Sequence, residues 1–187
     1  MDTNHTFTPG RAVLFVGPTE GDKISVARKF AEPYGDVAIA DAGLLEERHG
    51  IANILLDHPV KTLIIDGLPG SPAGWHQVKT LLSSSHIACP RKGRRSVMRE
   101  IPHLIFCTGA PAALPSDSEQ RRFYIVDAEV ATRGYAKAEA AGKPPLEAQD
   151  ILDAAYMALA GECAKQAAEH LSVAEADALA RRIAATA

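Results

Sequence analysis

The fold is decided by one stretch near the N-terminus, Ala12-Val13-Leu14-Phe15-Val16-Gly17-Pro18-Thr19-Glu20-Gly21-Asp22-Lys23-Ile24. Its first five residues are apolar and predict a buried strand, which leads into a loop that opens with Gly17. Lys23 follows Gly17 with the spacing of the G-x-x-x-x-G-K-[ST] loop, in which backbone N–H groups surround phosphates and the lysine reaches the outer ones. We therefore expect Gly17, Gly21 and Lys23 to form a nucleotide-binding loop after this strand.

This loop departs from the motif at two positions. Asp22 stands where the second glycine belongs, and Ile24 stands where a hydroxyl group would bind Mg²⁺. Asp22 brings a negative charge and a Cβ atom to a place where the backbone must approach a polyanion. Ser25 comes one residue late, which turns it about 100° around a helix. The loop would take ATP and Mg²⁺ as cofactors, but these substitutions predict weak or absent hydrolysis.

Composition and charge narrow the class of protein. The chain has 187 residues, of which 47% are hydrophobic, and a formal net charge of −3. A chain of this kind can bury a core, and any affinity for nucleic acid must come from a local basic patch. Three widely spaced cysteines predict reduced thiols and neither a zinc site nor a disulfide framework. Since no apolar run is long enough to span a membrane, we expect a cytoplasmic protein.

Strands that alternate with helices predict an α/β fold. Nearly all-apolar strands are expected at residues 12–16, 37–40, 62–65, 104–107 and 123–126. Helices are expected directly after the loop and at residues 44–56 and 75–82, with a loop at 70–74. Strands of this composition indicate a P-loop NTPase-like parallel sheet that helices cover on both faces.

The chain divides into three parts by composition. A flexible tail is expected at residues 1–10, the P-loop NTPase-like domain at 11–128, and an alanine-rich helical segment at 129–187. Within the last part, helical periodicity predicts helices at 147–169 and 173–184. This segment could pack on the sheet domain or form a contact between subunits, and the sequence leaves both open.

Asp66 and two arginines are the candidate catalytic residues. Asp66 ends the third strand, as does the carboxylate that holds Mg²⁺ beside a phosphate-binding loop, although Asp-Gly is also a common turn. Asp66 is thus the candidate metal ligand, and Gly67 occupies the place of a second acid. Arg121 and Arg122 precede the fifth strand, where they could form rim salt bridges or reach a neighbouring subunit's γ-phosphate as an arginine finger.

A basic segment between Cys89 and Arg99 is the candidate nucleic-acid interface. It contains five cations and no acid, namely Arg91, Lys92, Arg94, Arg95 and Arg99. Lys92-Gly93 predicts the tip of a hairpin, and cations at a tip suit phosphate contacts that do not depend on sequence. Few aromatic residues accompany them, so stacking of bases is not indicated. A solvated charged loop is the alternative interpretation.

In order and spacing, these motifs resemble the ATPase core of superfamily three helicases, replication proteins of small DNA viruses, phages and plasmids related to the AAA+ class. Residues 17–23 are similar to the Walker A motif of that family, and residues 63–66 fall at Walker B. Residues 91–95 fall at the presensor hairpin that tracks DNA, 104–109 at sensor 1, and 121–125 resemble the arginine-finger segment. Gly109 stands where the family has a water-orienting asparagine. The resemblance covers about residues 11–128 and implies an oligomeric ATPase fold.

Three functions follow from these patterns. The first is a degenerate P-loop NTPase-fold protein of phage or mobile-element type, which binds nucleic acid or a replication partner through the basic hairpin with weak or absent ATP hydrolysis. The second is an active homo-oligomeric motor of the ATPase or helicase type. The third is a non-enzymatic protein-interaction module, such as an inhibitor, for which the P-loop fold is only a scaffold.

Overall fold

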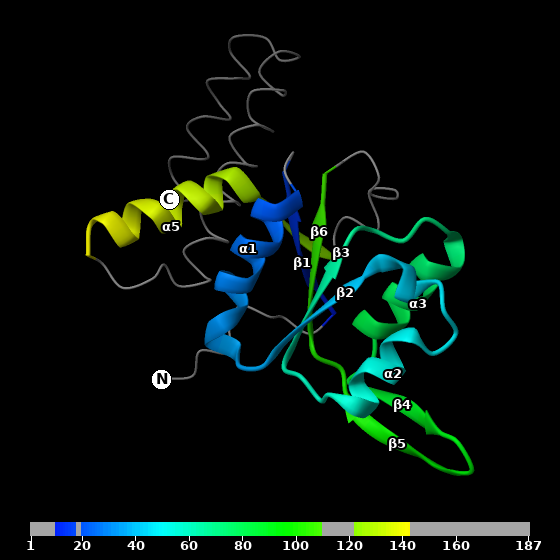
Figure 1. Cartoon of the computed structure of the whole chain (residues 1–187). Helices are drawn as coiled ribbons and strands as arrows, with labels where there is room; N and C mark the ends of the chain where they lie inside the picture. The colour runs from blue at the N-terminus through cyan, green and yellow to red at the C-terminus, as the bar shows by residue number, and fades with distance from the viewer. Residues whose placement is uncertain (1–9, 18–19, 110–121, 143–187) are drawn as a thin grey trace, which may run out of the picture.

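Five parallel strands form a central sheet in the computed structural model of the chain, which describes residues 10–17, 20–109 and 122–142 (Figure 1). In spatial order they are β2 (Val37–Asp41), β3 (Thr62–Asp66), β6 (His103–Thr108), β1 (Ala12–Val16) and β7 (Phe123–Asp127). The five predicted strands are confirmed, four of them extended by one residue at one or both ends. The α/β class with a parallel sheet is also confirmed, and this sheet is compatible with a Rossmann-like or P-loop-like fold.

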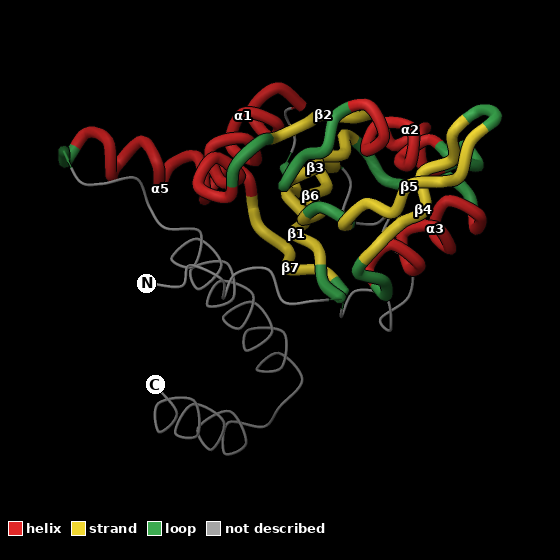
Figure 2. The backbone as a smooth tube through the Cα atoms, turned by 90° about the horizontal axis from the view of Figure 1, so that it is seen from below, coloured by secondary structure: helices red, strands yellow, loops and turns green. Residues whose placement is uncertain are grey.

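Helices cover both faces of the sheet, as the sequence predicts (Figure 2). The helices α1 (Glu20–Ala31) and α5 (Ala128–Ala140) lie on one face, which we call the α1 face. The helices α2 (Gly50–Asp57) and α3 (Pro72–Leu82) lie on the other, the α2 face. Successive strand residues point to opposite faces, so Phe15 is buried on the α1 face and Leu14 on the α2 face. Short 3₁₀ turns, η1 (Glu32–Tyr34) and η2 (Ala42–Leu45), flank β2.

Two predicted helix boundaries are wrong. The segment 44–56 is not one helix, because η2 ends at Leu45 and α2 begins only at Gly50. The chain folds back so closely between them that a Cβ atom on Gly50 would collide with the carbonyl oxygen of Leu44. The predicted loop 70–74 also contains the start of α3, where the Ser71 side chain accepts a hydrogen bond from the Gly74 N–H at 3.1 Å and Pro72 occupies the first turn.

Helix α5 begins directly after β7. The Asp127 carboxylate caps it, accepting hydrogen bonds from the N–H groups of Glu129 and Val130 at 2.8 and 3.0 Å. Ala131 and Tyr135 are buried in the α1-face cluster, so the start of the alanine-rich segment packs on the sheet. The predicted tail up to residue 9 and the predicted helices at 147–169 and 173–184 lie outside the described residues. The division of the chain into three parts stays a prediction.

A separate two-stranded antiparallel hairpin is formed by β4 (His86–Arg91) and β5 (Arg94–Glu100). Lys92 and Gly93 form its tip, as predicted, and Gly93 adopts a φ of 68°, the left-handed conformation that favours glycine in a tight turn. The hairpin connects α3 to β6 and packs against α2. Within the described ranges, no helix combines the length and the apolar character that crossing a membrane requires.

Candidate phosphate-binding site and nucleic-acid interface

The carboxyl ends of the parallel strands bring four predicted site residues to one edge of the sheet. Val16 of β1 is in register with Thr108 of β6, and Asp66 of β3 is in register with Cys107 of β6. Gly17 follows β1 at this edge, and the first turns of α1 carry Gly21 and Lys23. Open α/β sheets bind ligands at this edge, so its residues form the candidate phosphate-binding site.

Lys23 extends back to the start of the loop. Its side chain is only 1% exposed, and its Nζ atom donates a hydrogen bond to the carbonyl oxygen of Gly17 at 2.8 Å. A Cβ atom on Gly109 would lie 3.9 Å from Nζ, so position 109 directly adjoins the ammonium group. The bond to Gly17 engages one of the three N–H donors of this ammonium. Lys23 is thus buried beside the start of the loop, and its contact with phosphates stays a prediction.

The Cys107 thiol lies close enough to both Lys23 and Asp66 for their charges to shift its pKa. Burial raises the pKa of Cys107 to about 12; the negative charge of Asp66 raises this pKa too, and the Lys23 ammonium group lowers it. Asp66 of β3 pairs with Cys107 of β6, and the Cys107 side chain is buried between the sheet and α1. The raised pKa keeps this thiol protonated near neutral pH, which makes it a poor nucleophile in the folded protein.

The motif positions that would bind Mg²⁺ depart further from the expected residues than those that would bind phosphate. Ile24 packs against the α1-face cluster, and Ser25 is exposed and lines a cavity of about 130 Å³ between α1 and α5. Ser25 thus lies on the side of α1 that adjoins α5, and its inability to bind Mg²⁺ stays a prediction. The part of the chain that the structure describes has no group of three or more potential metal-ligating side chains. Among the predicted site residues, Asp66 is the carboxylate at this edge; phosphate binding by Lys23 and Mg²⁺ binding by Asp66 both stay predictions.

Arg122 lies at the opposite edge of the sheet. It directly precedes β7, its carbonyl oxygen accepts a hydrogen bond from the Ala12 N–H at 2.8 Å, and its Nη1 atom donates to the Ser83 hydroxyl at 3.5 Å. Within one chain, Arg122 is therefore separated from Lys23 and Asp66 by the length of the strands. Its role as an arginine finger would require a neighbouring subunit and stays a prediction, and Arg121 lies outside the described residues.

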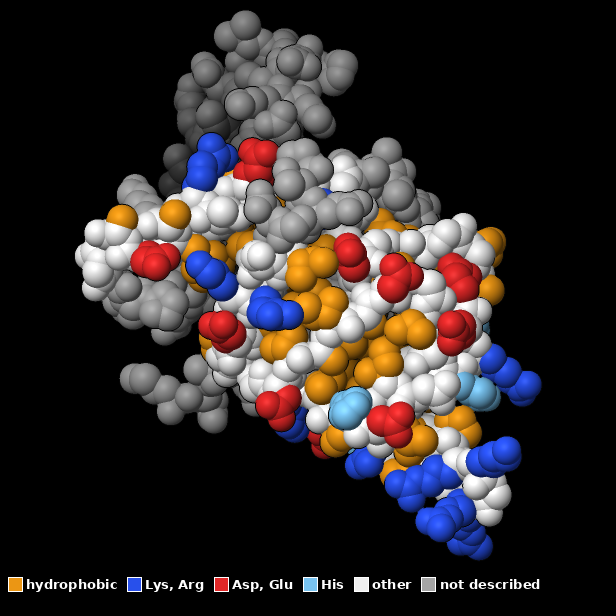
Figure 3. Space-filling view, viewed as in Figure 1, with side chains coloured by type: hydrophobic (Ala, Val, Ile, Leu, Met, Phe, Trp, Pro, Cys, Tyr) orange, Lys and Arg blue, Asp and Glu red, His pale blue; other side chains and the backbone are white. Residues whose placement is uncertain are grey.

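Four of the five predicted phosphate-contacting cations are exposed at the end of the hairpin. Figure 3 shows basic side chains gathered at this projecting end of the molecule. Among the described residues, no acidic side chain lies within 4.0 Å of these four. We call them the tip cations: Arg91, Lys92, Arg94 and Arg95. Such charges are available to an external anion.

Arg99 differs from the tip cations. It pairs with Ile87 on the inner face of the hairpin, is only half-exposed, and has a buried Nε atom without a hydrogen-bond partner in the described structure. Burial raises the pKa of the neighbouring Cys89 thiol, and the positive charge of Arg99 lowers it. Arg99 thus lies on the hairpin face that packs against the protein, and its contact with phosphates stays a prediction.

The two candidate sites lie at opposite edges of the sheet. The hairpin leaves the end of α3 and returns to the start of β6, so its base is at the amino edge, while Gly17, Lys23 and Asp66 are at the carboxyl edge (Figure 1). The sequence did not indicate the nearness of Cys107 to Lys23 and Asp66. No local sequence pattern indicates it, because these residues are far apart in the sequence and are brought together by the register of β3, β6 and β1.

Comparison with known proteins shows little. No family model matches the chain, and no curated protein matches it. Two solved A-form apo structures of the NrS-1 C-terminal region are similar to it, at 13% identity with a TM-score of 0.44 and at 15% identity with a TM-score of 0.46. The matches cover 66% and 79% of this chain but only 29% and 35% of those chains, so this chain spans less than half of their length. A likeness this distant carries no argument about function.

Proposed function

We propose that this chain is a nucleic-acid-binding protein on a P-loop NTPase-like scaffold, with weak or absent ATP hydrolysis. The observation that carries the proposal is the arrangement of the tip cations. Four exposed positive charges stand on a projecting hairpin, and no described acid neutralises them. The resemblance of residues 11–128 to replication helicases supports the same class of partner.

The physics of the tip favours a polyanion. In a chain of net charge −3, attraction to nucleic acid must arise locally, and the hairpin concentrates positive charge beyond the body of the molecule. Arginine forks pair well with phosphate oxygens, and such contacts release counterions. Binding through the tip should therefore be sensitive to salt and indifferent to base sequence.

The residues at the carboxyl edge of the sheet are the reason for proposing weak ATP hydrolysis. When bound, Mg²⁺ would neutralise charge on the phosphates of ATP, and Asp66 is the described carboxylate that would hold it. The positions of the hydroxyl ligand, the second acid and the water-orienting amide carry Ile24, Gly67 and Gly109. Lys23 could still bind phosphate, but glycine at positions 67 and 109 provides no side chain to position an attacking water.

The test is a binding titration by fluorescence anisotropy with a labelled single-stranded oligonucleotide at low salt. The parent should bind, and Arg94→Glu/Arg95→Glu should lose most of the affinity. The matched control is Arg28→Glu/Lys29→Glu, which changes net charge equally on an exposed turn of α1 and should bind as the parent does. Absence of binding by the parent, or equal losses in both variants, would refute the proposal.

A second function, nucleotide binding, is favoured by the contact between Lys23 and Gly17. The ammonium group and the Asp66 carboxylate flank the Cys107 thiol, an arrangement that suits the phosphates of ATP with Mg²⁺. Both functions are compatible because the two sites lie at opposite edges. In an active homo-oligomer, Arg121 or Arg122 would act on a neighbouring subunit, and turnover per chain would rise with protein concentration. A rate equal to background over that range would refute the oligomeric motor.

A further inference from the structure

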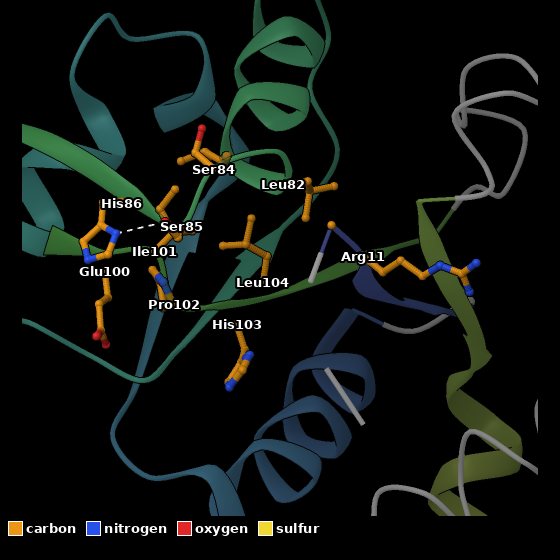
Figure 4. A pocket seen from close by; sticks show the side chains of 12 residues that line it. Arg11, Leu82, Ser84, Ser85, His86, Glu100, Ile101, Pro102, His103 and Leu104 are labelled. Carbon is orange, nitrogen blue, oxygen red and sulfur yellow. Dashed lines mark hydrogen bonds between the residues drawn. The ribbon is translucent and has the colours of Figure 1, made fainter. Parts of the chain in front are cut away.

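A cavity of about 290 Å³ opens at the base of the hairpin, at the amino edge of the sheet (Figure 4). Its volume is near the lower end of the roughly 300–1,000 Å³ that small-ligand sites occupy. α3, the hairpin and β6 each contribute to its wall. The cavity thus suits a group of about the size of one nucleobase.

The lining combines an apolar floor with a polar rim. Leu82, Ile101 and Leu104 provide apolar side chains, and Leu82 and Leu104 are buried. The rim carries hydroxyl, imidazole and carboxylate groups from Ser84, Ser85, His86 and Glu100. Arg11 also contributes to the wall, but its side chain points away towards β7, where its guanidinium lies 5.1 Å from the ring centre of Tyr124.

This chemistry suits a base better than a phosphate. Arg11 is the arginine among the lining residues, and its guanidinium lies over Tyr124, while Lys61 lies 3.6 Å from the rim carboxylate of Glu100. Apolar walls favour the faces of a heterocycle, and the carboxylate and hydroxyl groups can accept hydrogen bonds from the N–H groups of its edge. A base within a duplex cannot enter such a cavity, because its edge and faces are already covered.

The hairpin connects this cavity to the tip cations by one exposed face. His86 and Glu100 form a pair on that face, and Ala88 and Met98 form the next pair towards the tip. Met98 is 59% exposed, although it is apolar. From Glu100 to Arg94 the strand is about 20 Å long at the usual rise per residue. An extended nucleic-acid strand could follow this face from the tip to the cavity.

We infer that the cavity at the hairpin base binds one unpaired base of a single-stranded nucleic acid whose phosphates contact the tip cations. This inference depends on the proposed function. It adds that the partner is single-stranded and that the two ends of the hairpin divide the work. The tip of the hairpin contacts phosphates, and the cavity at its other end holds one nucleobase that is not stacked on its neighbours.

The experiment fills the cavity and compares two strands. Ser84→Trp places a large side chain at the rim, and Thr80→Trp places the same side chain on an exposed part of α3 outside the cavity. Anisotropy titrations use a mixed-sequence single strand and an abasic strand of equal length. Ser84→Trp should weaken binding of the first strand roughly tenfold, the loss expected when about 55 Å² of base surface is no longer buried. It should leave the abasic strand and the salt dependence unchanged.

Retained binding of the abasic strand shows that Ser84→Trp is folded, and Thr80→Trp should bind both strands as the parent does. An unchanged affinity of Ser84→Trp for the mixed strand would overturn the inference. Equal parental affinity for single strands and duplexes would also overturn it, as would equally tight binding of free cytidine monophosphate. The variant Arg94→Glu/Arg95→Glu tests the proposed function separately. If it loses binding while Ser84→Trp keeps it, the proposed function stands and only the inference about the cavity fails.

Discussion

Neutralising two of the tip cations should reduce the salt dependence of nucleic-acid binding by about half. The variant Arg94→Gln/Arg95→Gln keeps the length and polarity of these exposed side chains and removes two of the four charges. Each phosphate that a cation neutralises on a single strand contributes about −0.7 to the slope of log K against log salt concentration. If each tip cation contacts one phosphate, the parent slope is about −2.8 and the variant slope about −1.4.

These slopes translate into measurable affinities. Between about 50 and about 200 mM salt, the affinity of the parent should fall about 50-fold and that of the variant about sevenfold. The assay is a series of anisotropy titrations of one labelled single strand at several salt concentrations. The control Arg28→Gln/Lys29→Gln removes two exposed charges from α1 and should keep the parent slope. Equal slopes in the parent and in the hairpin variant would show that Arg94 and Arg95 do not contact phosphates.

Three further predictions concern other parts of the molecule. If the loop binds ATP, ATP at about 100 times its Kd should stabilise the parent by about 2.7 kcal/mol in a thermal-shift titration, and Lys23→Ala should abolish the shift. The Ser71 hydroxyl, which donates a hydrogen bond to Glu46, holds the pKa of that carboxyl below its ordinary value of 4.5. Ionised Glu46 therefore stabilises the fold above that pH, and the contribution is lost as the pH falls, so urea unfolding of Glu46→Gln should differ from the parent near pH 7 and converge towards it near pH 3. Burial raises the pKa of Cys89 and Cys107, so iodoacetamide near pH 8 should label these two cysteines only after unfolding, and prompt labelling of either one in the native protein, located by peptide mass spectrometry, would contradict its placement.

The features that the sequence could predict are those with a local cause. Parallel strands buried on both faces must be apolar along their whole length, which made β1, β3 and β6 visible as runs. A lysine and a glycine between two strand patterns identified the hairpin tip. The approach of Lys23 to Asp66 could be expected because the carboxyl ends of parallel strands meet at one edge.

The features that escaped prediction depend on contacts between distant segments. The break between η2 and α2 follows from the close approach of Gly50 to Leu44, which helical periodicity does not reveal. Arg99 is separated from the tip cations by the packing of one hairpin face on the body of the protein. The cavity at the hairpin base needs three segments to close around it. The start of α3 had a local signal, since Ser71-Pro72 is a typical helix start, but the glycines on either side suggested a loop.

The most direct test of the central claim is a map of the nucleic-acid contact. A single strand that carries a photoreactive base at every position is crosslinked to the parent protein, and the modified peptides are identified by mass spectrometry. The account predicts crosslinks within residues 84–104, at the hairpin and its cavity, and none at residues 16–24. A strand that binds but crosslinks only at the carboxyl edge, or elsewhere than at the hairpin, would contradict it.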